Sequence, residues 1–206
     1  MTTIDEIMRM APVIPVLVIE EEVDPVALAK ALVEGGLPVI EVTLRTPNAL
    51  AAMRAMATVP GAIVGAGTVL NPDMLRTAIG AGAQFIVSPG LTDPLARAAI
   101  ESGIPFLPGI ANSGDIMRGL DHGLKRFKFF PAEAAGGLPA LKALAGPFAD
   151  IRFCPTGGIV EATARNWLAH PSVLCVGGSW LLPAGERDMA RVTERAKLAS
   201  RLRDTA

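Results

Sequence analysis

A single lysine, Lys128, stands between two phenylalanines in the short apolar segment 126–131. Side chains alternate across a β-strand, so Phe127 and Phe129 would lie on one face and Lys128 on the other. If helices cover the two phenylalanines, the lysine points into whatever the strand encloses. Desolvation favours the neutral amine of a lysine, and a neutral amine is a nucleophile toward carbonyl groups. The segment indicates a Schiff-base lysine, and a solvated lysine at a strand end, like Lys125, is the alternative.

A carboxylate is predicted on the inner face of an earlier strand. Glu41 alternates with Ile40 and Val42, whose apolar side chains should pack beneath helices. A carboxylate inside a protein needs a charged partner or a catalytic task. We therefore expect Glu41 to move protons, and an ion pair with Arg45 is the alternative.

Two glycine-rich loops indicate a phosphate site. They follow the last two apolar segments and contain Thr156, Gly157 and Gly158 in the first loop and Gly177, Gly178 and Ser179 in the second. In (β/α)8 enzymes, the loops after strands seven and eight bind phosphate through backbone N–H groups and a helix N-terminus. These groups supply positive potential without a lysine or arginine.

The elements that would position these residues form a regular alternation. The predicted strands span residues 15–19, 39–44, 62–65, 84–87, 105–107, 126–129, 151–154 and 174–177. The predicted helices span residues 25–34, 48–58, 72–79, 94–101, 114–121, 137–145, 161–168 and 187–201. Asp24, Asn71 and Asp93 each precede a proline and are expected to cap helices.

This alternation predicts one α/β domain over residues 1–206, a (β/α)8 TIM barrel with its chemistry at the carboxyl ends of the strands. An open doubly wound sheet is the alternative. The predicted function is that of a barrel enzyme for a phosphorylated carbonyl compound. A phosphosugar isomerase or epimerase, with Lys128 as an electrostatic clamp, and a non-catalytic phosphate-ligand binder remain open.

Composition argues against several other classes. Half of the 206 residues are apolar, the net charge is −1 and no basic run occurs, so no nucleic acid is expected as a partner. No apolar run reaches the length of a membrane span, so no membrane is expected either. Cys154 and Cys175 are predicted to be buried reduced thiols of a cytoplasmic protein. Neither the cysteines nor His122 and His170 have metal-ligand spacing, and no metal or other cofactor is expected.

Six motifs carry a family resemblance: EVTLRT at 41–46, GAGTVL at 65–70, IVSPG at 86–90, FKFFPAE at 127–133, FCPTGGI at 153–159 and GGSWL at 177–181. Over essentially its whole length the chain resembles the 2-keto-3-deoxy-6-phosphogluconate (KDPG)/4-hydroxy-2-oxoglutarate aldolase family. The resemblance implies a homotrimeric class I aldolase of the Entner–Doudoroff pathway. Such an enzyme cleaves 2-dehydro-3-deoxy-6-phosphogluconate to pyruvate and D-glyceraldehyde 3-phosphate.

The resemblance also implies a role for each site residue. Lys128 would be the Schiff-base lysine and Glu41 the general acid/base. Pyruvate would be bound by Arg45, Thr68, Pro89 and Phe130, and phosphate by Thr156, Gly157, Gly158, Gly178 and Ser179. The family includes enzymes that cleave 4-hydroxy-2-oxoglutarate, so that substrate and 2-dehydro-3-deoxy-6-phosphogalactonate remain alternatives. Residues 111–113 depart from the family's Thr-x-Ser/Thr-Glu pattern, which leaves substrate preference open, although Asn112 can still cap the next helix.

Overall fold

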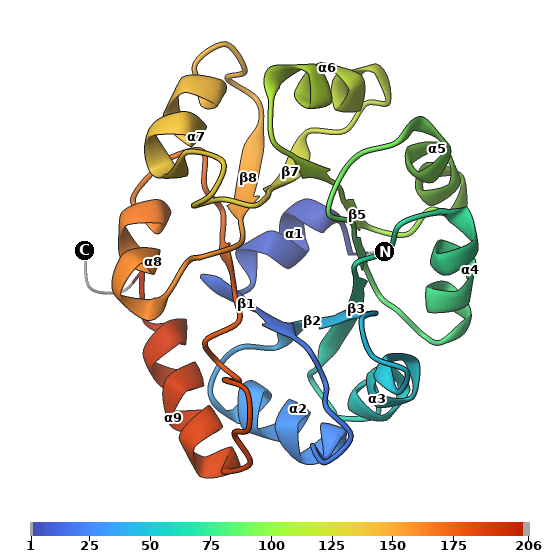
Figure 1. The fold of residues 1–206 in the computed structure, drawn as a ribbon, viewed down its shortest axis with the longest axis vertical. Coiled ribbons are helices and arrows are strands. Elements are labelled where there is room, and N and C mark those ends of the chain that lie inside the picture. The colour runs from blue at the N-terminus through green and yellow to red at the C-terminus, as the bar shows by residue number, and fades with distance from the viewer. Residues whose placement is uncertain (1, 204–206) are drawn as a thin grey trace.

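The computed structural model describes residues 2–203, in which parallel strands curve around a common interior and helices surround them (Figure 1). The strands are β1 (Val13–Leu17), β2 (Val39–Thr43), β3 (Ile63–Gly67), β4 (Ile86–Val87), β5 (Phe106–Leu107), β6 (Gly109–Ile110), β7 (Arg126–Phe129), β8 (Arg152–Pro155) and β9 (Val176–Gly178). The helices are α1 (Ile4–Arg9), α2 (Pro25–Glu34), α3 (Ala49–Met56), α4 (Pro72–Gly80), α5 (Asp93–Ser102), α6 (Ser113–Asp121), α7 (Gly137–Ala145), α8 (Glu161–Leu168) and α9 (Met189–Ser200). The predicted parallel α/β architecture is confirmed.

The strands form two curled sheets, with the orders β5-β4-β3-β2-β1-β9 and β6-β7-β8. Between β8 and β9 the sheets are joined by isolated bridges that pair Phe153 with Val173 and Thr156 with Gly177. At the other junction, Pro108 alone separates β5 from β6. Proline has no backbone N–H, which interrupts the strand, but its carbonyl still accepts a hydrogen bond from the Lys128 N–H at 2.8 Å. The predicted strand at residues 105–107 therefore continues beyond this proline.

Apolar side chains pack in two layers, one on each face of the sheets. Ile40, Val42, Phe127 and Phe129 are fully buried in the outer layer, between the strands and the helices, as their alternation predicted. A second group, which we call the inner cluster, fills the interior that the strands enclose: Ile7, Met8, Ile14, Val39, Phe85, Val87, Leu107, Cys154, Leu174 and Cys175. Glu41, between Ile40 and Val42, and Lys128, between Phe127 and Phe129, must therefore face this interior.

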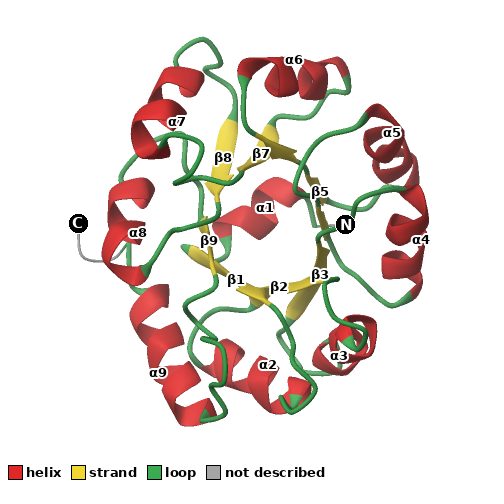
Figure 2. Ribbon diagram, in the orientation of Figure 1, coloured by secondary structure: helices red, strands yellow, loops and turns green. Residues whose placement is uncertain are grey.

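Helix α1 was not predicted, and it lies across the interior that the strands surround (Figure 2). The Thr3 side chain and the Glu6 side chain form a capping box at its first turn, and Ile7 and Met8 join the inner cluster. Asp5 pairs with Arg126, the first residue of β7. The helix thus closes the end of the interior at which the strands begin.

The caps of the helices explain where the helices start. Asp24 accepts hydrogen bonds from the N–H groups of residues 26 and 27, and Asn71 accepts one from the N–H of residue 74, so both predicted caps are confirmed. The prediction for Asp93 was wrong, because Thr92 is the N-cap of α5 and the Asp93 carboxylate lies 3.1 Å from His122 Nε2 instead. Helix α9 begins two residues later than predicted, after the capping side chain of Asp188.

Both cysteines are free and buried, as predicted. Burial raises the pKa of the Cys175 thiol, and the neighbouring Cys154 thiol raises it further, so Cys175 stays protonated. Within residues 2–203, no helix is long and apolar enough to cross a membrane. The same residues contain no cluster of three or more His, Cys, Asp or Glu side chains that could hold a metal ion.

Candidate active site

Two opposite charges meet in the interior above the inner cluster. Lys128 Nζ, from β7, lies 3.1 Å from Glu41 Oε1, from β2, and the two side chains are only 6% and 4% exposed. The predicted burial of both side chains is therefore confirmed. The alternative ion pair of Glu41 with Arg45 is not formed, because the Arg45 Nε donates to Thr68 Oγ1 at 3.1 Å.

Glycine makes room for this pair. A Cβ atom on Gly67 would lie 2.2 Å from Glu41 Oε1, so a larger residue at this position would displace the carboxylate. The next residue, Thr68, has a φ of 61°, a left-handed conformation that is costly for a β-branched residue. The strained backbone holds the Thr68 hydroxyl where Arg45 reaches it. Residues 65–70 form one of the resemblance motifs, but the sequence did not indicate that Glu41 lies against Gly67.

The loops after β4 and β7 form the mouth above the ion pair. The Lys128 Nζ lies 5.3 Å from the centre of the half-buried Phe130 ring. Pro89 is half-buried. The residues on either side of it are joined by a hydrogen bond, which the Ser88 hydroxyl donates to the Gly90 carbonyl at 2.6 Å. A Cβ atom on Gly109 would lie 2.2 Å from the Pro89 carbonyl oxygen. The sequence indicated Pro89 and Phe130 as site residues, and it placed Ser88 and Gly109 at strand ends without showing that they position the proline.

Beneath the pair, the interior offers no other charged partner among the described residues of the inner cluster. Cys154 is the register partner of Lys128 on β8, and its side chain belongs to that cluster. Lys128 Nζ donates a hydrogen bond to Glu41 Oε1, so an amine and a carboxylate lie in direct contact in this interior. A neutral amine beside a carboxyl group can attack a carbonyl carbon and move the protons that the attack requires.

The loops after β8 and β9 lie side by side at the same edge. Gly157 and Gly158 have φ angles of 104° and 81°, which favour glycine. In the part of the chain that the structure describes, the N–H groups of Gly157, Gly158 and Ser179 donate to no protein acceptor. Unpaired N–H groups at a loop of this kind are suited to binding an anion.

Two predicted phosphate residues are placed differently from the others. Thr156 is buried with its Oγ1 3.4 Å from the Cys154 carbonyl oxygen, and Gly178 lies within β9, where a Cβ atom would collide with the Trp180 ring. The helix N-terminus expected after β9 is absent from residues 179–188, which form turns, bends and irregular segments, because α9 starts at Met189. The positive potential at the loop after β9 therefore comes from its backbone N–H groups and not from the N-terminus of α9.

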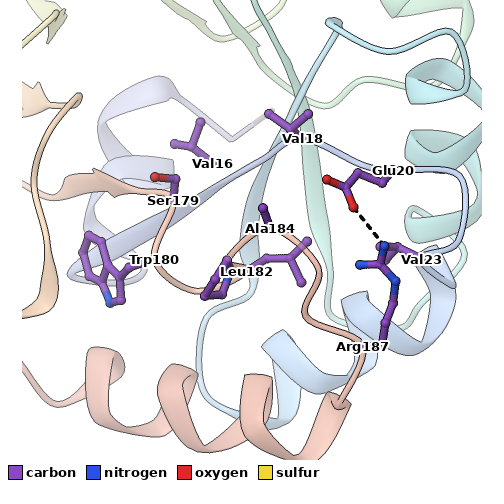
Figure 3. A pocket seen from close by; sticks show the side chains of 10 residues that line it. Val16, Val18, Glu20, Val23, Ser179, Trp180, Leu182, Ala184 and Arg187 are labelled. Carbon is purple, nitrogen blue, oxygen red and sulfur yellow. Dashed lines mark hydrogen bonds and ion pairs between the residues drawn. The ribbon is translucent and has the colours of Figure 1, made fainter.

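A pocket of about 340 Å³ opens beside this loop (Figure 3). Its walls are mostly aliphatic, and it is lined by Val16, Val18, Glu20, Val23, Ser179, Trp180, Leu182, Pro183, Ala184 and Arg187. Val16 is the register partner of Glu41 on the adjacent strand. The pocket therefore extends from the strand beside Glu41, past Ser179, to the surface.

The loop at residues 111–113 keeps its capping function. Asn112 accepts a hydrogen bond from the Asp115 N–H at 3.0 Å, and the Asp115 carboxylate accepts one from the Ala111 N–H at 3.0 Å. The expected cap of α6 by asparagine is confirmed.

Comparison with known proteins identifies relatives over the whole site. The sequence model of the family described as KDPG and KHG aldolase matches residues 4–195. The KHG/KDPG aldolase of Escherichia coli K12 is 55% identical over 202 residues, which cover 96% of this chain and 95% of that protein.

Solved structures give the same result. The 2-keto-3-deoxy-6-phosphogluconate aldolase of Zymomonas mobilis ZM4, solved with 3-phosphoglycerate, is 59% identical with a TM-score of 0.94 over 96% of this chain and 94% of that chain. The KDPG aldolase of Legionella pneumophila, solved with pyruvate captured as a covalent carbinolamine intermediate, is 44% identical with a TM-score of 0.93 over 97% and 98% of the two chains.

Proposed function

The chain belongs to the KDPG and KHG aldolase family, and from this membership and the Lys128–Glu41 pair we propose that it is a class I aldolase. Its substrate is 2-dehydro-3-deoxy-6-phosphogluconate, which it cleaves to pyruvate and D-glyceraldehyde 3-phosphate in the Entner–Doudoroff pathway. The enzyme is an aldehyde-lyase. The observation that carries the proposal is the 3.1 Å contact between a buried lysine amine and a buried carboxylate.

The reaction begins at the lysine. The neutral amine of Lys128 attacks the C2 carbonyl of the substrate and gives a carbinolamine, which loses water to form an iminium. Glu41 takes the proton of the C4 hydroxyl, and the C3–C4 bond breaks as the aldehyde forms. The bonding electrons move into the iminium and leave an enamine. Glu41 returns the proton to C3, and water then hydrolyses the iminium to release pyruvate and free Lys128.

The substrate-binding roles follow the positions of the loops. Arg45, Thr68, Pro89 and Phe130 surround the pyruvate part of the substrate at the mouth above Lys128. The phosphate is held by the N–H groups of Gly157, Gly158 and Ser179, with Thr156 and Gly178 shaping the loops. The carbinolamine formed by the Legionella enzyme and the 3-phosphoglycerate in the Zymomonas structure support these two subsites.

We further infer the finer features of the assembly. The two curled sheets, joined at β8 and β9 and separated only by Pro108, are interpreted as one closed (β/α)8 barrel in a single domain. The homotrimer and the cytoplasmic location remain predictions.

Borohydride trapping tests the chemistry directly. Pyruvate with borohydride should leave a reduced adduct on Lys128, located by peptide mass spectrometry, because only a Schiff base is fixed by this reduction. The Lys128→Ala variant should fold but lose activity by several orders of magnitude. An adduct on Lys125 or Lys142, or none at all, would contradict the mechanism. The absence of any adduct would favour an isomerase, an epimerase or a non-catalytic phosphate-ligand binder.

A second candidate function concerns the substrate, because the E. coli relative is named for both KHG and KDPG. Cleavage of 4-hydroxy-2-oxoglutarate or 2-dehydro-3-deoxy-6-phosphogalactonate uses the same lysine chemistry. The values of kcat/KM for the three substrates decide among them. The phosphate loops favour the phosphorylated gluconate by at least about tenfold over 4-hydroxy-2-oxoglutarate, because binding energy from the phosphate lowers the barrier.

A further inference from the structure

One arginine joins two loops at the rim of the pocket beside Ser179. Arg187 Nη2, from the segment between β9 and α9, lies 2.9 Å from Glu20 Oε2 and 3.3 Å from Glu22 Oε2, in the loop after β1. Figure 3 shows the Arg187–Glu20 contact at one side of the pocket, with Ser179 and Trp180 at the other. We call Arg187, Glu20 and Glu22 the rim clasp.

Hydrogen bonds fix the backbone of residues 186–188, the segment that carries Arg187. The Glu186 carboxylate accepts hydrogen bonds from the N–H groups of Arg187 at 3.1 Å and Asp188 at 3.0 Å, and its other oxygen accepts one from Arg195 Nη2 at 2.9 Å. The hydrogen bonds from Asp188 and Arg195 hold the pKa of Glu186 below its ordinary value. These hydrogen bonds fix residues 186–188 against α9. The ion pairs of Arg187 then link this segment to the loop after β1.

The clasp also sets the charge at the rim. Three consecutive glutamates, residues 20–22, precede α2, and two of them face Arg187. Without the guanidinium, their carboxylates would repel a phosphate approaching the pocket lined by Ser179. The ion pairs are 39–72% exposed, so each is weak and the fold does not depend on them.

We propose that Arg187 is a positioning residue for the phosphorylated end of the substrate. Through Glu20 and Glu22 it closes the outer wall of the pocket beside Ser179 and offsets part of the negative charge of these carboxylates on the path of the phosphate. The inference rests on the proposed function for the identity of the substrate, and this positioning residue lies outside the six motifs that carry the family resemblance.

The Arg187→Gln variant tests the clasp. Calorimetry with 3-phosphoglycerate as the probe should give a Kd about three- to tenfold weaker than in the parent, the range expected for two exposed ion pairs. The KM for 2-dehydro-3-deoxy-6-phosphogluconate should rise by a similar factor while kcat stays within about twofold. Pyruvate trapping at Lys128 should be unchanged, because pyruvate carries no phosphate. The difference from the parent should shrink in about 1 M salt, which screens exposed charges.

Two matched variants separate the clasp from a general loss of charge or of structure. Arg76→Gln breaks an exposed ion pair with Asp73 on α4 and should bind 3-phosphoglycerate as the parent does. Arg187→Glu should bind it more weakly than Arg187→Gln, and adding Glu20→Arg to Arg187→Glu should recover most of the loss.

The outcomes distinguish this inference from the proposed function. An unchanged Kd and KM in Arg187→Gln would overturn the clasp, as would an equal loss of pyruvate trapping, which would mean a structural role. A parent enzyme that forms no pyruvate adduct would overturn the proposed function instead. The calorimetric comparison would still decide the role of Arg187.

Discussion

A buried ion pair such as Lys128–Glu41 contributes little to stability, because removing both charges from water costs about as much as their attraction returns. Breaking the pair by deleting one partner is destabilising, because the other charge stays buried without a counter-charge. Gly67 is also kept free of a side chain so that the carboxylate fits. The buried pair therefore does little to stabilise the fold, which favours a catalytic role for Lys128 and Glu41.

Replacement of Glu41 by Gln keeps the shape of the side chain and can still accept a hydrogen bond from Lys128. It removes the proton acceptor for the C4 hydroxyl, and general acid–base catalysis contributes roughly 10²–10⁴-fold. Turnover in steady-state assays should fall within that range, while borohydride trapping of pyruvate should persist. Turnover at the parent rate would show that Glu41 serves only as a counter-charge for Lys128.

Ser179 offers a test of phosphate recognition that does not disturb packing, because its side chain is exposed and its N–H is unpaired in the described structure. Ser179→Asp places a negative charge where we expect the phosphate. The KM for the phosphorylated substrate should rise at least about tenfold through repulsion, while pyruvate trapping at Lys128 should be retained. Ser179→Ala serves as the control with no added charge. Equal loss in both assays would show that the loop supports the fold rather than the phosphate.

At the scale of elements, helix α1 and strand β7 form one unit at the closed end of the interior. Partial burial acts to raise the pKa of Asp5, but hydrogen bonds from Arg9 and Arg126 outweigh it and hold that pKa below its ordinary value. Arg126 begins the strand that carries Lys128 two residues later. The ion pair between Asp5 and Arg126 therefore links helix α1 to β7, the strand that carries Lys128.

Asp5→Asn should lower the free energy of unfolding by about 1 kcal/mol at neutral pH, the scale of a partly exposed charged pair. The folded-state pKa of Asp5 is depressed, so its stabilising contribution is present above the unfolded value of about 3.9 and is lost as the pH falls through the lower folded value. Urea unfolding at pH 7 and near pH 3 should show the difference from the parent shrinking in acid. Asp73→Asn, in an exposed pair on α4, is the control. A difference that grows in acid would contradict the argument.

Local sequence signals predicted many element boundaries, and long-range contacts account for what was missed. The bounds of α2, α7 and α8 match the predictions, because prolines, glycines and amphipathic patterns are local signals. Alternation also placed Lys128 and Glu41 in the interior. It could not show that Gly67 faces Glu41, since that contact depends on the pairing of β2 with β3.

Two elements were missed for different reasons. Helix α1 has a capping signal at Thr3 and Glu6 that could have revealed it, but its six residues show too few apolar repeats. The strand after Pro108 was missed because proline is read as the end of a strand, whereas here its carbonyl still pairs with β7.

At the scale of the whole molecule, three apolar side chains on helices α5 and α6 are exposed to solvent. Ile100 on α5 and Met117 and Leu120 on α6 are 46%, 58% and 37% exposed. Arg118 of α6 and His122, the residue that caps its C-terminal end, lie within 4 Å of Asp93 at the start of α5, so the two helices are held side by side. Exposed apolar surface of this kind favours covering by another subunit.

We expect the protein to assemble as a homotrimer, which the family resemblance implies and which closed cyclic symmetry permits. Burying apolar side chains between copies gains roughly 25 cal/mol for each Å² removed from water, and the shared surface must be large enough to exceed the roughly 4–15 kcal/mol that association costs in lost freedom of motion. Sedimentation equilibrium at micromolar concentration should give a mass near three chains. On dilution, the mass and the activity should fall together. A monomer with full kcat at the same concentration would contradict the assembly and would show that each subunit holds a complete, independently working site.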